Sequence, residues 1–337
     1  MLVFIKYWDT WGKRMKLLTI GIPTYNRRVY LQECIERLLP QVEENHEQVE
    51  LYISDNCSND DTSDFLKQIA LNHPAVAYYI QPENLGAERN FISIFNHAVG
   101  KYVWILSDDD IVVDNGVKRI LEYLQKNPDL NYVHMNNYFF KGDYSQETML
   151  KPRLTDKQDT VFTSKNDVIK TVGCNITLIT TSIFNTDVIH KIDDLEQYIP
   201  TLFVQGYAFL LSTKDSEVKV GYIGKPVVAV RQNSEVKYNM YLIFGEGLWN
   251  MMQYAVQECG YPFKEVYKAY YDYWRKVVLM GVIGAKANGY KNMYKGFGRF
   301  FKATWTHPRA WVELYPMLLV PAPFYAWIKK IYHTIKR

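Results

Sequence analysis

The stretch VWILSDDDIVVDNG, residues 103–116, sets three carboxylates side by side directly after a run of large apolar side chains. A short apolar run that ends in polar residues indicates a buried strand, which places Asp108, Asp109 and Asp110 at the end of that strand. Adjacent like charges repel, and a buried charge is costly unless a positive group pairs with it. The cluster therefore predicts a cationic partner, for which a divalent metal ion is the obvious candidate, whereas a solvated turn is the alternative.

The chain around this stretch alternates between apolar runs and segments with helical spacing. Strands are predicted at 16–23, 49–54, 75–80, 101–106, 130–140, 175–185 and 225–231. Helices are predicted at 28–42, 59–72, 86–99 and 115–128, and aromatic helices follow from about residue 236. Alternation of this kind predicts an α/β protein with a mostly parallel, doubly wound sheet.

Charge is distributed unevenly along the chain. The net charge is +3, but residues 262–337 hold 14 Lys and Arg against 3 Asp and Glu, or +11, so the other residues carry −8. We place a boundary near residue 260 on this shift, and Met15 opens the first strand-like run. The predicted divisions are an N-terminal extension at 1–14, a main domain at 15–260 with halves 15–140 and 141–260, and a helical tail at 261–337.

The tail mixes Lys and Arg with Trp, Tyr and Phe, which suits three different surroundings. Such residues contact nucleic acid, lie at a membrane surface, or belong to helices that pack against the main domain. The apolar run MLLVPAPFYAWI, residues 317–328, is too short and too interrupted by proline to span a bilayer, but cations flank it. We therefore favour the membrane surface over packing alone and expect no nucleic-acid partner.

The spacing of the cysteines and the N-terminal residues bear on the cellular location of the protein. Cys34, Cys57, Cys174 and Cys259 are widely spaced and form no CxxC pair, so reduced thiols fit best. The start of the chain has no small-residue cleavage site after its apolar run, and no uncharged apolar run reaches 18 residues. These features predict a cytoplasmic protein without a transmembrane helix, peripheral at the inner face of the cell membrane.

Polar residues follow each of the first four predicted strands. These segments are PTYNRR (23–28), DNCSND (55–60), QPENLGAERN (81–90) and SDDD (107–110). Ligands of open parallel sheets bind beyond the carboxyl ends of the strands, so we expect the four segments to share one crevice. The chain has no GxxxxGK[ST] phosphate loop. Phosphate charge is then expected to meet Mg²⁺ or Mn²⁺ on the aspartates, helped by Arg27 and Arg89.

Four motifs carry a resemblance to a known family. TIGIPTYNR, YISDNCSND, ENLGAERN and WILSDDDI, in this order and spacing, resemble family 2 glycosyltransferases of the GT-A fold over residues 16–140. The chain is most similar to bacterial enzymes that build O-antigen and other surface polysaccharides. The resemblance implies a nucleotide-diphosphate sugar as donor, with a UDP-sugar favoured, and a growing, lipid-linked surface glycan as acceptor.

The resemblance also implies a role for each matching position. Those expected around the nucleoside are Pro23, Thr24, Tyr25, Asp55, Gly86, Arg89 and Asn90. Asp55 would accept a hydrogen bond from the base. The family's metal pattern is close to LDxDD and reads LSDDD here, so Ser107 stands in place of the first aspartate. Asp110 would bind the metal, Asp108 or Asp109 the ribose or the metal, and Arg231 the donor diphosphate.

The chain departs from the family at the general base, the residue that takes the proton of the acceptor hydroxyl. The resemblance makes residues 15–140 the nucleotide-sugar half of the main domain and residues 141–260 the acceptor half. Inverting members carry an acidic pair at the head of a helix in the acceptor half, but the expected helix start near Pro200 has Thr201 and no acid. Asp193, Asp194 and Glu196 lie just upstream, and Asp194 is our choice for the general base. The departure keeps a second hypothesis open, a sugar-nucleotide binding protein without catalysis. A sugar-phosphate nucleotidyltransferase is the third, although GIPTYNRR lacks its glycine-rich signature.

Overall fold

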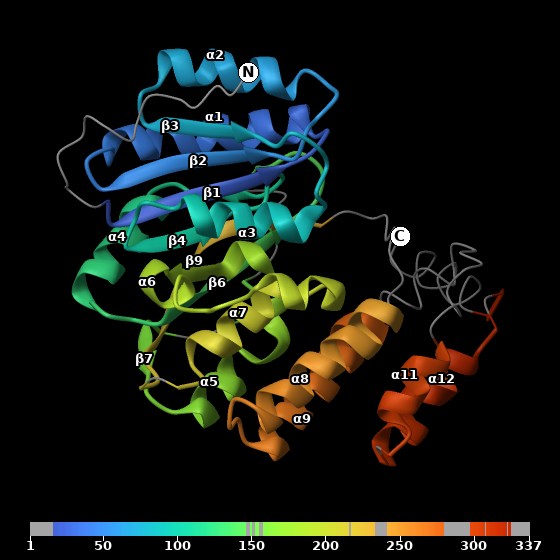
Figure 1. Ribbon diagram of the computed structural model, residues 1–337. Coiled ribbons are helices and arrows are strands. Elements are labelled where there is room, and N and C mark those ends of the chain that lie inside the picture. Colours follow the sequence, from blue (N-terminus) through green and yellow to red (C-terminus); the bar gives the residue numbers. More distant parts are fainter. Residues whose placement is uncertain are drawn as a thin grey trace.

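Figure 1 shows a computed structural model of the chain. The structure describes residues 16–145, 149, 152–154, 158–215, 217–232, 241–279, 297–306, 308–321 and 323–324. The predicted N-terminal extension, residues 1–14, lies outside these ranges.

The first half of the chain forms four parallel strands that alternate with helices. The strands are β1 (Leu18–Thr24), β2 (Val49–Asp55), β3 (Val76–Ile80) and β4 (Tyr102–Ile105). The helices are α1 (Arg28–Glu44), α2 (Thr62–Asn72), α3 (Ala87–His97) and, after the two-residue strand β5 (Ile111–Val112), α4 (Gly116–Lys126). Strand β1 pairs in parallel with β2 and β4, and β2 with β3, which confirms the predicted α/β alternation.

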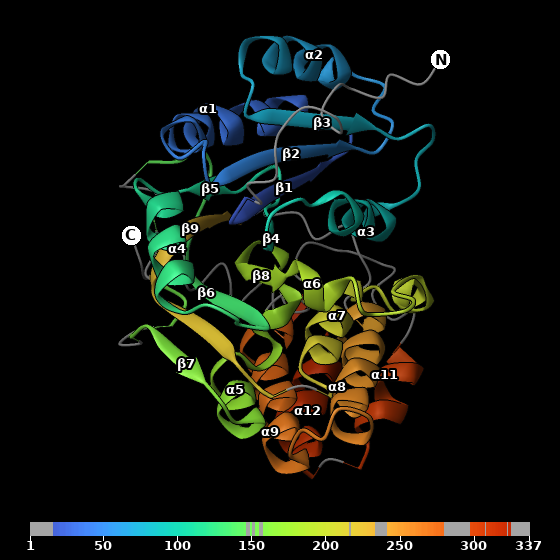
Figure 2. The same ribbon diagram turned by 60° about the vertical axis from the view of Figure 1, so that its left-hand side comes forward.

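Strand β4 shows how the sheet builds a core on each face. Tyr102 and Trp104 pack into the apolar cluster that includes α1 and α4, while Val103 and Ile105 pack into the cluster that includes α3. Successive side chains of a strand point to opposite faces, and here helices cover both, so all four are buried. Figures 1 and 2 show α1 and α3 on opposite sides of the strands, which confirms the doubly wound arrangement.

The second half extends the sheet with strands of mixed direction. Its strands are β6 (Tyr132–Phe140), β7 (Thr160–Phe162), β8 (Ser182–Asn185) and β9 (Val220–Arg231). Within the described residues the sheet has nine strands in the order β3-β2-β1-β4-β8-β6-β9-β5, and β7 pairs with β9. Strand β8 is antiparallel to β4 and β6, whereas β6 and β9 are parallel. The helices of this half are α5 (Lys165–Thr171), α6 (Thr186–Ile189) and α7 (Val204–Ser212).

One predicted strand is mostly wrong. The segment 175–185 was expected to be a single strand, but only its last four residues form β8. Before them the chain makes two 3₁₀ turns, Gly173–Thr177 and Ile179–Thr181. The Thr177 hydroxyl donates to the Cys174 carbonyl at 2.9 Å and the Thr181 hydroxyl to the Leu178 carbonyl at 2.7 Å. Hydroxyl groups that bond to the backbone three residues earlier stabilise turns at the expense of strand pairing.

The C-terminal region is helical, as predicted. It contains α8 (Leu248–Gln257), α9 (Phe263–Tyr273), α11 (Phe297–Thr304), α12 (Tyr315–Leu319) and three π-helical segments at 241–247, 274–278 and 310–314. Phe300 of α11 stacks on Trp274 with ring centroids 4.2 Å apart, and both rings are fully buried. Trp274 Nε1 also donates to the Phe244 carbonyl at 2.6 Å, so the tail packs against the π-helical segment 241–247 that precedes α8. Over the described ranges, no helix has the length and apolar character needed to cross a membrane.

Candidate functional site

The carboxyl ends of the first strands meet at one edge of the sheet. Thr24 at the end of β1 pairs with Asp55 at the end of β2, and the Asn56 amide donates to the Thr24 carbonyl at 2.9 Å. The loops beyond them are joined as well, since the Asn26 amide donates to the Ser58 hydroxyl at 2.8 Å. The structure thus brings together the segments that follow the first two strands, as the sequence predicted.

Asp108 lies directly beyond β4 and contacts the loop after β1. The Thr24 hydroxyl donates to Asp108 Oδ2 at 2.8 Å, and Arg27 Nε lies 2.9 Å from Asp108 Oδ1. Arg27 also pairs with Asp109, which accepts a 2.7 Å hydrogen bond from the Ser107 hydroxyl. Burial raises the pKa of the Asp108 carboxyl to about 7, and the Arg27 guanidinium opposes that rise. Arg27 is therefore the cation that holds the first two carboxylates.

Asp110 is held by neutral donors instead. The Thr180 hydroxyl donates to its Oδ2, and the Arg231 amide donates to its Oδ1 at 2.9 Å. Burial, followed by the charge of Asp109, raises the pKa of the Asp110 carboxyl to about 8. This side chain is 3% exposed, so it has little water to stabilise its charge. A bound cation would favour its ionised form.

The Arg231 side chain is engaged away from Asp110. Its Nε donates to the Asp109 carbonyl at 3.1 Å and its Nη2 pairs with Glu33 of α1 at 2.5 Å. The guanidinium also lies 4.5 Å from the centre of the Phe140 ring. The Arg231 side chain therefore links β9 to the segment that holds the aspartates and to α1. Its contact with the donor diphosphate stays a prediction.

The residues present fit a divalent metal ion that is completed by substrate. Over the described ranges, no three Asp, Glu, His or Cys side chains are grouped so that they alone could hold an ion. Mg²⁺ and Mn²⁺, however, commonly take one or two carboxylates and fill their shell with water and substrate phosphates. Asp108 and Asp110 are two buried carboxylates two residues apart, and burial raises the pKa of both. Their chemistry suits an ion that arrives with a diphosphate.

Asn90 contacts Ser54, the residue before Asp55, and the side chains of both Asp55 and Asn90 form hydrogen bonds within the protein. Asp55 is fully buried, and its carboxylate accepts hydrogen bonds from the Ser58 amide and hydroxyl and, at 3.1 Å, from the Ser63 hydroxyl. Asn90 of α3 exchanges two hydrogen bonds with Ser54, the last residue before Asp55, at 2.6 and 2.9 Å. These contacts stabilise the loop, and the predicted contact of Asp55 with a base stays a prediction.

The other residues that were expected around the nucleoside lie at the protein surface, at the same carboxyl edge of the sheet. Pro23 is partly exposed, and Tyr25 is exposed. Gly86 precedes α3 with a φ of +85°, a conformation that side chains rarely adopt, which accounts for glycine at this position. Arg89 is exposed and pairs with Glu196, its Nε lying 3.8 Å from Oε2.

The acidic residues upstream of Thr201 are all exposed. Asp194 accepts a 2.9 Å hydrogen bond from the Glu196 amide, at the start of the 3₁₀ helix Glu196–Thr201. The following helix, α7, begins at Val204 and has no acidic residue in its first turn. The structure thus places Asp194 on the surface of the acceptor half, and its role as a base stays a prediction.

Sequence reasoning did not identify Glu88, the carboxylate that contacts the first residue of α7. Glu88 of α3 accepts a 3.1 Å hydrogen bond from the Val204 amide, and burial raises the pKa of Glu88 to about 7. Glu88 lies in the motif ENLGAERN, beside Arg89, and this was the only sequence feature that pointed to it. Its contact with a backbone amide cannot be recognised from the sequence. Thr180 was missed for a similar reason, because its segment was expected to be a plain strand.

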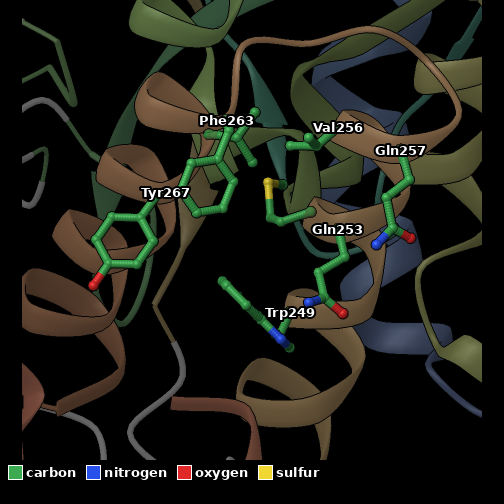
Figure 3. A pocket seen from close by; sticks show the side chains of 8 residues that line it. Trp249, Gln253, Val256, Gln257, Phe263 and Tyr267 are labelled. Carbon is green, nitrogen blue, oxygen red and sulfur yellow. The ribbon is translucent and has the colours of Figure 1, made fainter. Parts of the chain in front are cut away.

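A small apolar hollow lies elsewhere, between α8 and α9. Figure 3 shows Trp249 and Gln253 on one side and Phe263 and Tyr267 on the other. Its volume is about 60 Å³, too small for a sugar nucleotide, and it contains no predicted site residue. We therefore assign the functional site to the strand ends.

Comparison with known proteins shows which family the chain belongs to. Residues 19–193 match the family model described as glycosyl transferase family 2, which is more than half of the 337 residues. The chain belongs to this family. The match covers the strand-end segments that hold Asp55, Glu88 and the three aspartates.

Curated relatives resemble part of the chain. The abequosyltransferase RfbV of Salmonella typhimurium is 33% identical over 115 residues, which are 34% of this chain and 34% of that protein. A Campylobacter jejuni protein named GalNAc(5)-diNAcBac-PP-undecaprenol beta-1,3-glucosyltransferase is 26% identical over 109 residues, 32% of this chain and 34% of its own. The aligned part therefore spans about a third of these relatives.

Solved structures extend the likeness to most of the fold. TarS of S. aureus in complex with UDP-GlcNAc has a TM-score of 0.60 at 13% identity, covering 85% of this chain and 81% of that one. The mannosyltransferase PcManGT of Pyrobaculum calidifontis, in complex with GDP-Man and Mn²⁺, has a TM-score of 0.54 at 14% identity, covering 97% and 91%. At such identities the likeness shows the fold alone, which is GT-A.

Proposed function

We propose that the chain is an inverting glycosyltransferase that moves a sugar from a nucleotide-diphosphate sugar, with a UDP-sugar favoured, to a lipid-linked surface glycan. Family membership supports glycosyl transfer, and the names of the relatives support bacterial glycan synthesis. The observation that carries the proposal is the buried pair Asp108 and Asp110 at the carboxyl edge of the parallel strands. Buried carboxylates at a ligand-binding edge suit a metal–diphosphate complex.

The chain's own residues fix the two carboxylates before substrate binds. Thr24 and Arg27 hold Asp108 from the loop after β1, while Thr180 and the Arg231 amide hold Asp110 from the acceptor half. Mg²⁺ or Mn²⁺ bound there would neutralise the charge that develops on the leaving diphosphate. Groups set in advance around that charge need no rearrangement at the moment of reaction.

Inversion follows from a single displacement at the sugar. The acceptor hydroxyl attacks the anomeric carbon from the face opposite the diphosphate, so the new bond has the reversed configuration. A carboxylate within about 3 Å is needed to take the hydroxyl proton. Asp194 is the choice that the sequence favours, and its exposed position in the acceptor half leaves it open to an acceptor.

We also propose that the enzyme works at the inner face of the cell membrane. The described part of the tail has a buried side, with Phe300 and Leu318, and an outer side on which Trp305 and Trp311 are 53% and 52% exposed. Trp side chains favour the level of lipid headgroups, and cations near an anionic surface contribute about 1 kcal/mol each. A membrane location suits an acceptor that is carried by a lipid. The Campylobacter relative is named for such a substrate, a glycan linked to undecaprenol.

The decisive experiment offers the purified chain a panel of UDP-, dTDP-, GDP- and CDP-sugars with octyl glycosides as acceptors, with and without Mn²⁺. Metal-dependent release of the nucleoside diphosphate together with a new glycoside supports the proposal. Binding of a sugar nucleotide without turnover would instead support a binding protein. Release of pyrophosphate from a nucleoside triphosphate and a sugar phosphate would support a nucleotidyltransferase.

A further inference from the structure

Glu88 is a carboxylate without a charged partner. It lies in the first turn of α3 and is half-buried, and one of its oxygens accepts the Val204 amide hydrogen at 3.1 Å. Among the described residues no Lys, Arg or His pairs with it, since the neighbouring Arg89 turns to Glu196. Burial therefore raises the pKa of Glu88 to about 7, and the Val204 amide only partly opposes this. A carboxyl with such a pKa is suited to gain and lose a proton near neutral pH.

A second group at the head of α7 has an unsatisfied oxygen. Gln205 is 6% exposed, and its Nε2 donates to the Thr177 carbonyl at 3.3 Å. Its Oε1 is buried and has no hydrogen-bond partner among the residues that the structure describes. Buried polar atoms are almost always paired, so an orphaned acceptor indicates a donor that is absent from the protein alone. A sugar hydroxyl is such a donor.

The contacts of Gln205 connect this helix head to the aspartates. Thr177, which accepts from Gln205, lies three residues before Thr180, whose hydroxyl bonds Asp110. The first turns of α3 and α7 therefore lie beside the segment that borders the proposed metal site. Figures 1 and 2 both show α3 next to α7.

We propose that Glu88 is the general base of the transfer reaction and that Gln205 binds a hydroxyl group of the same acceptor sugar. This inference rests on the proposed function and replaces Asp194 in that role. Helix α7 has no acid in its own first turn, and Glu88 supplies one from α3. Asp194, in contrast, is exposed and accepts the Glu196 amide hydrogen.

The step conserves atoms and charge. The acceptor oxygen forms a bond to the anomeric carbon of the donor sugar, while the bond from that carbon to the diphosphate oxygen breaks. The diphosphate leaves with the electron pair of that bond. The hydroxyl proton passes to the Glu88 carboxylate and is released to water after the glycoside departs.

The test compares wild type with Glu88→Gln, which keeps an oxygen to accept the Val204 amide and so should fold. With a UDP-sugar and an octyl glycoside from the panel, we expect kcat to fall about 100-fold or more. The KM for the UDP-sugar should stay within about twofold, because Glu88 makes no contact with the aspartates that would hold the donor. The matched control is Glu122→Gln, since Glu122 is exposed on α4. It should behave as wild type.

Two further variants separate the alternatives. Gln205→Ala should raise the KM for the octyl glycoside more than it lowers kcat, as expected for a group that binds the acceptor. Glu88→Asp should recover part of the lost kcat, which a purely structural role would not produce. If Asp194→Asn loses activity while Glu88→Gln keeps it, Glu88 is not the base. If wild type transfers no sugar from any donor, the proposed function fails and this inference fails with it.

Discussion

The Thr180 hydroxyl donates a hydrogen bond to the Asp110 carboxylate across 70 residues of chain. Thr180 belongs to a 3₁₀ turn before β8, and Asp110 lies between β4 and β5. The bond therefore joins the predicted acceptor half to the carboxylates of the nucleotide half. The amide of Arg231, 121 residues from Asp110, holds the other oxygen. Two separate segments of the acceptor half thus set the orientation of the carboxylate to which we assign the metal.

We expect Asp110→Asn to abolish transfer and the Mn²⁺-dependent part of nucleotide binding without loss of the fold. The amide keeps an oxygen for Thr180 or the Arg231 amide but removes the charge that a metal needs. Because burial raises the pKa of Asp110 to about 8, loss of that charge should not destabilise the metal-free protein. Calorimetry of UDP with and without Mn²⁺, together with a thermal melt, measures both effects.

Asp114→Asn is the matched control for this change, because Asp114 is exposed four residues further along. It should leave metal-dependent binding at the wild-type level. Wild-type turnover by Asp110→Asn in the presence of Mn²⁺ would show that the metal assignment is wrong.

Asp55→Ala should weaken nucleotide binding by about 1–3 kcal/mol if the carboxylate contacts the base, the loss expected for a hydrogen bond to a charged group. It should also destabilise the loop, because the Ser58 amide and hydroxyl and the Ser63 hydroxyl lose their acceptor. Ser63→Ala removes one of these internal bonds and no expected base contact. Calorimetric dissociation constants that change equally in the two variants would reduce Asp55 to a loop residue.

Substitution of the outer side of the tail should weaken binding to vesicles of anionic lipid. Removal of the residues after 290 is a poor test, because it would uncover the buried Trp274 that stacks on Phe300. We instead expect Trp305→Gln combined with Trp311→Gln to reduce flotation with anionic vesicles, while salt weakens the remaining binding. Leu71→Gln is the control, since Leu71 is 84% exposed on α2, outside the tail. Wild type that stays unbound at low salt would make the tail a packing element.

Stability should report the Glu88 proton independently of activity. Burial raises the pKa of Glu88 from its usual 4.5 to about 7, so between these values the folded protein keeps a proton that the unfolded chain has released. Any stability from this group is complete below pH 4.5 and is lost as the pH rises through 7. Glu88→Gln has no carboxyl to titrate and therefore does not lose this stability as the pH rises. The Tm of Glu88→Gln minus the Tm of wild type should therefore increase from pH 5 to pH 8. A difference that stays flat or falls would show that Glu88 is not buried as described.

The sequence by itself determined the architecture of the first half and predicted where the site lies. Strand and helix periodicities are local properties, so the alternation from residue 16 to 140 could be read directly, and strands β1 to β4 were confirmed as parallel. Ligand sites of such sheets lie beyond the strand ends, and the motifs that hold Asp55, Arg89 and Asp110 were identified on that basis. The aromatic segments after about residue 236 likewise predicted the C-terminal helices, whereas the boundary near residue 260, placed on the charge shift, stays a prediction.

Tertiary structure alone decided which side chains work together. Glu88 reaches Val204 across 116 residues, and the partner is a backbone amide, a group that every residue except proline has. Such a contact has no sequence signature, and for this reason the search for an acid near Thr201 favoured Asp194. The same holds for Arg231, whose side chain pairs with Glu33 across 198 residues. Periodicity fixes each element, but the packing of elements distant in the chain fixes which carboxylate is buried, and burial is what sets its chemistry.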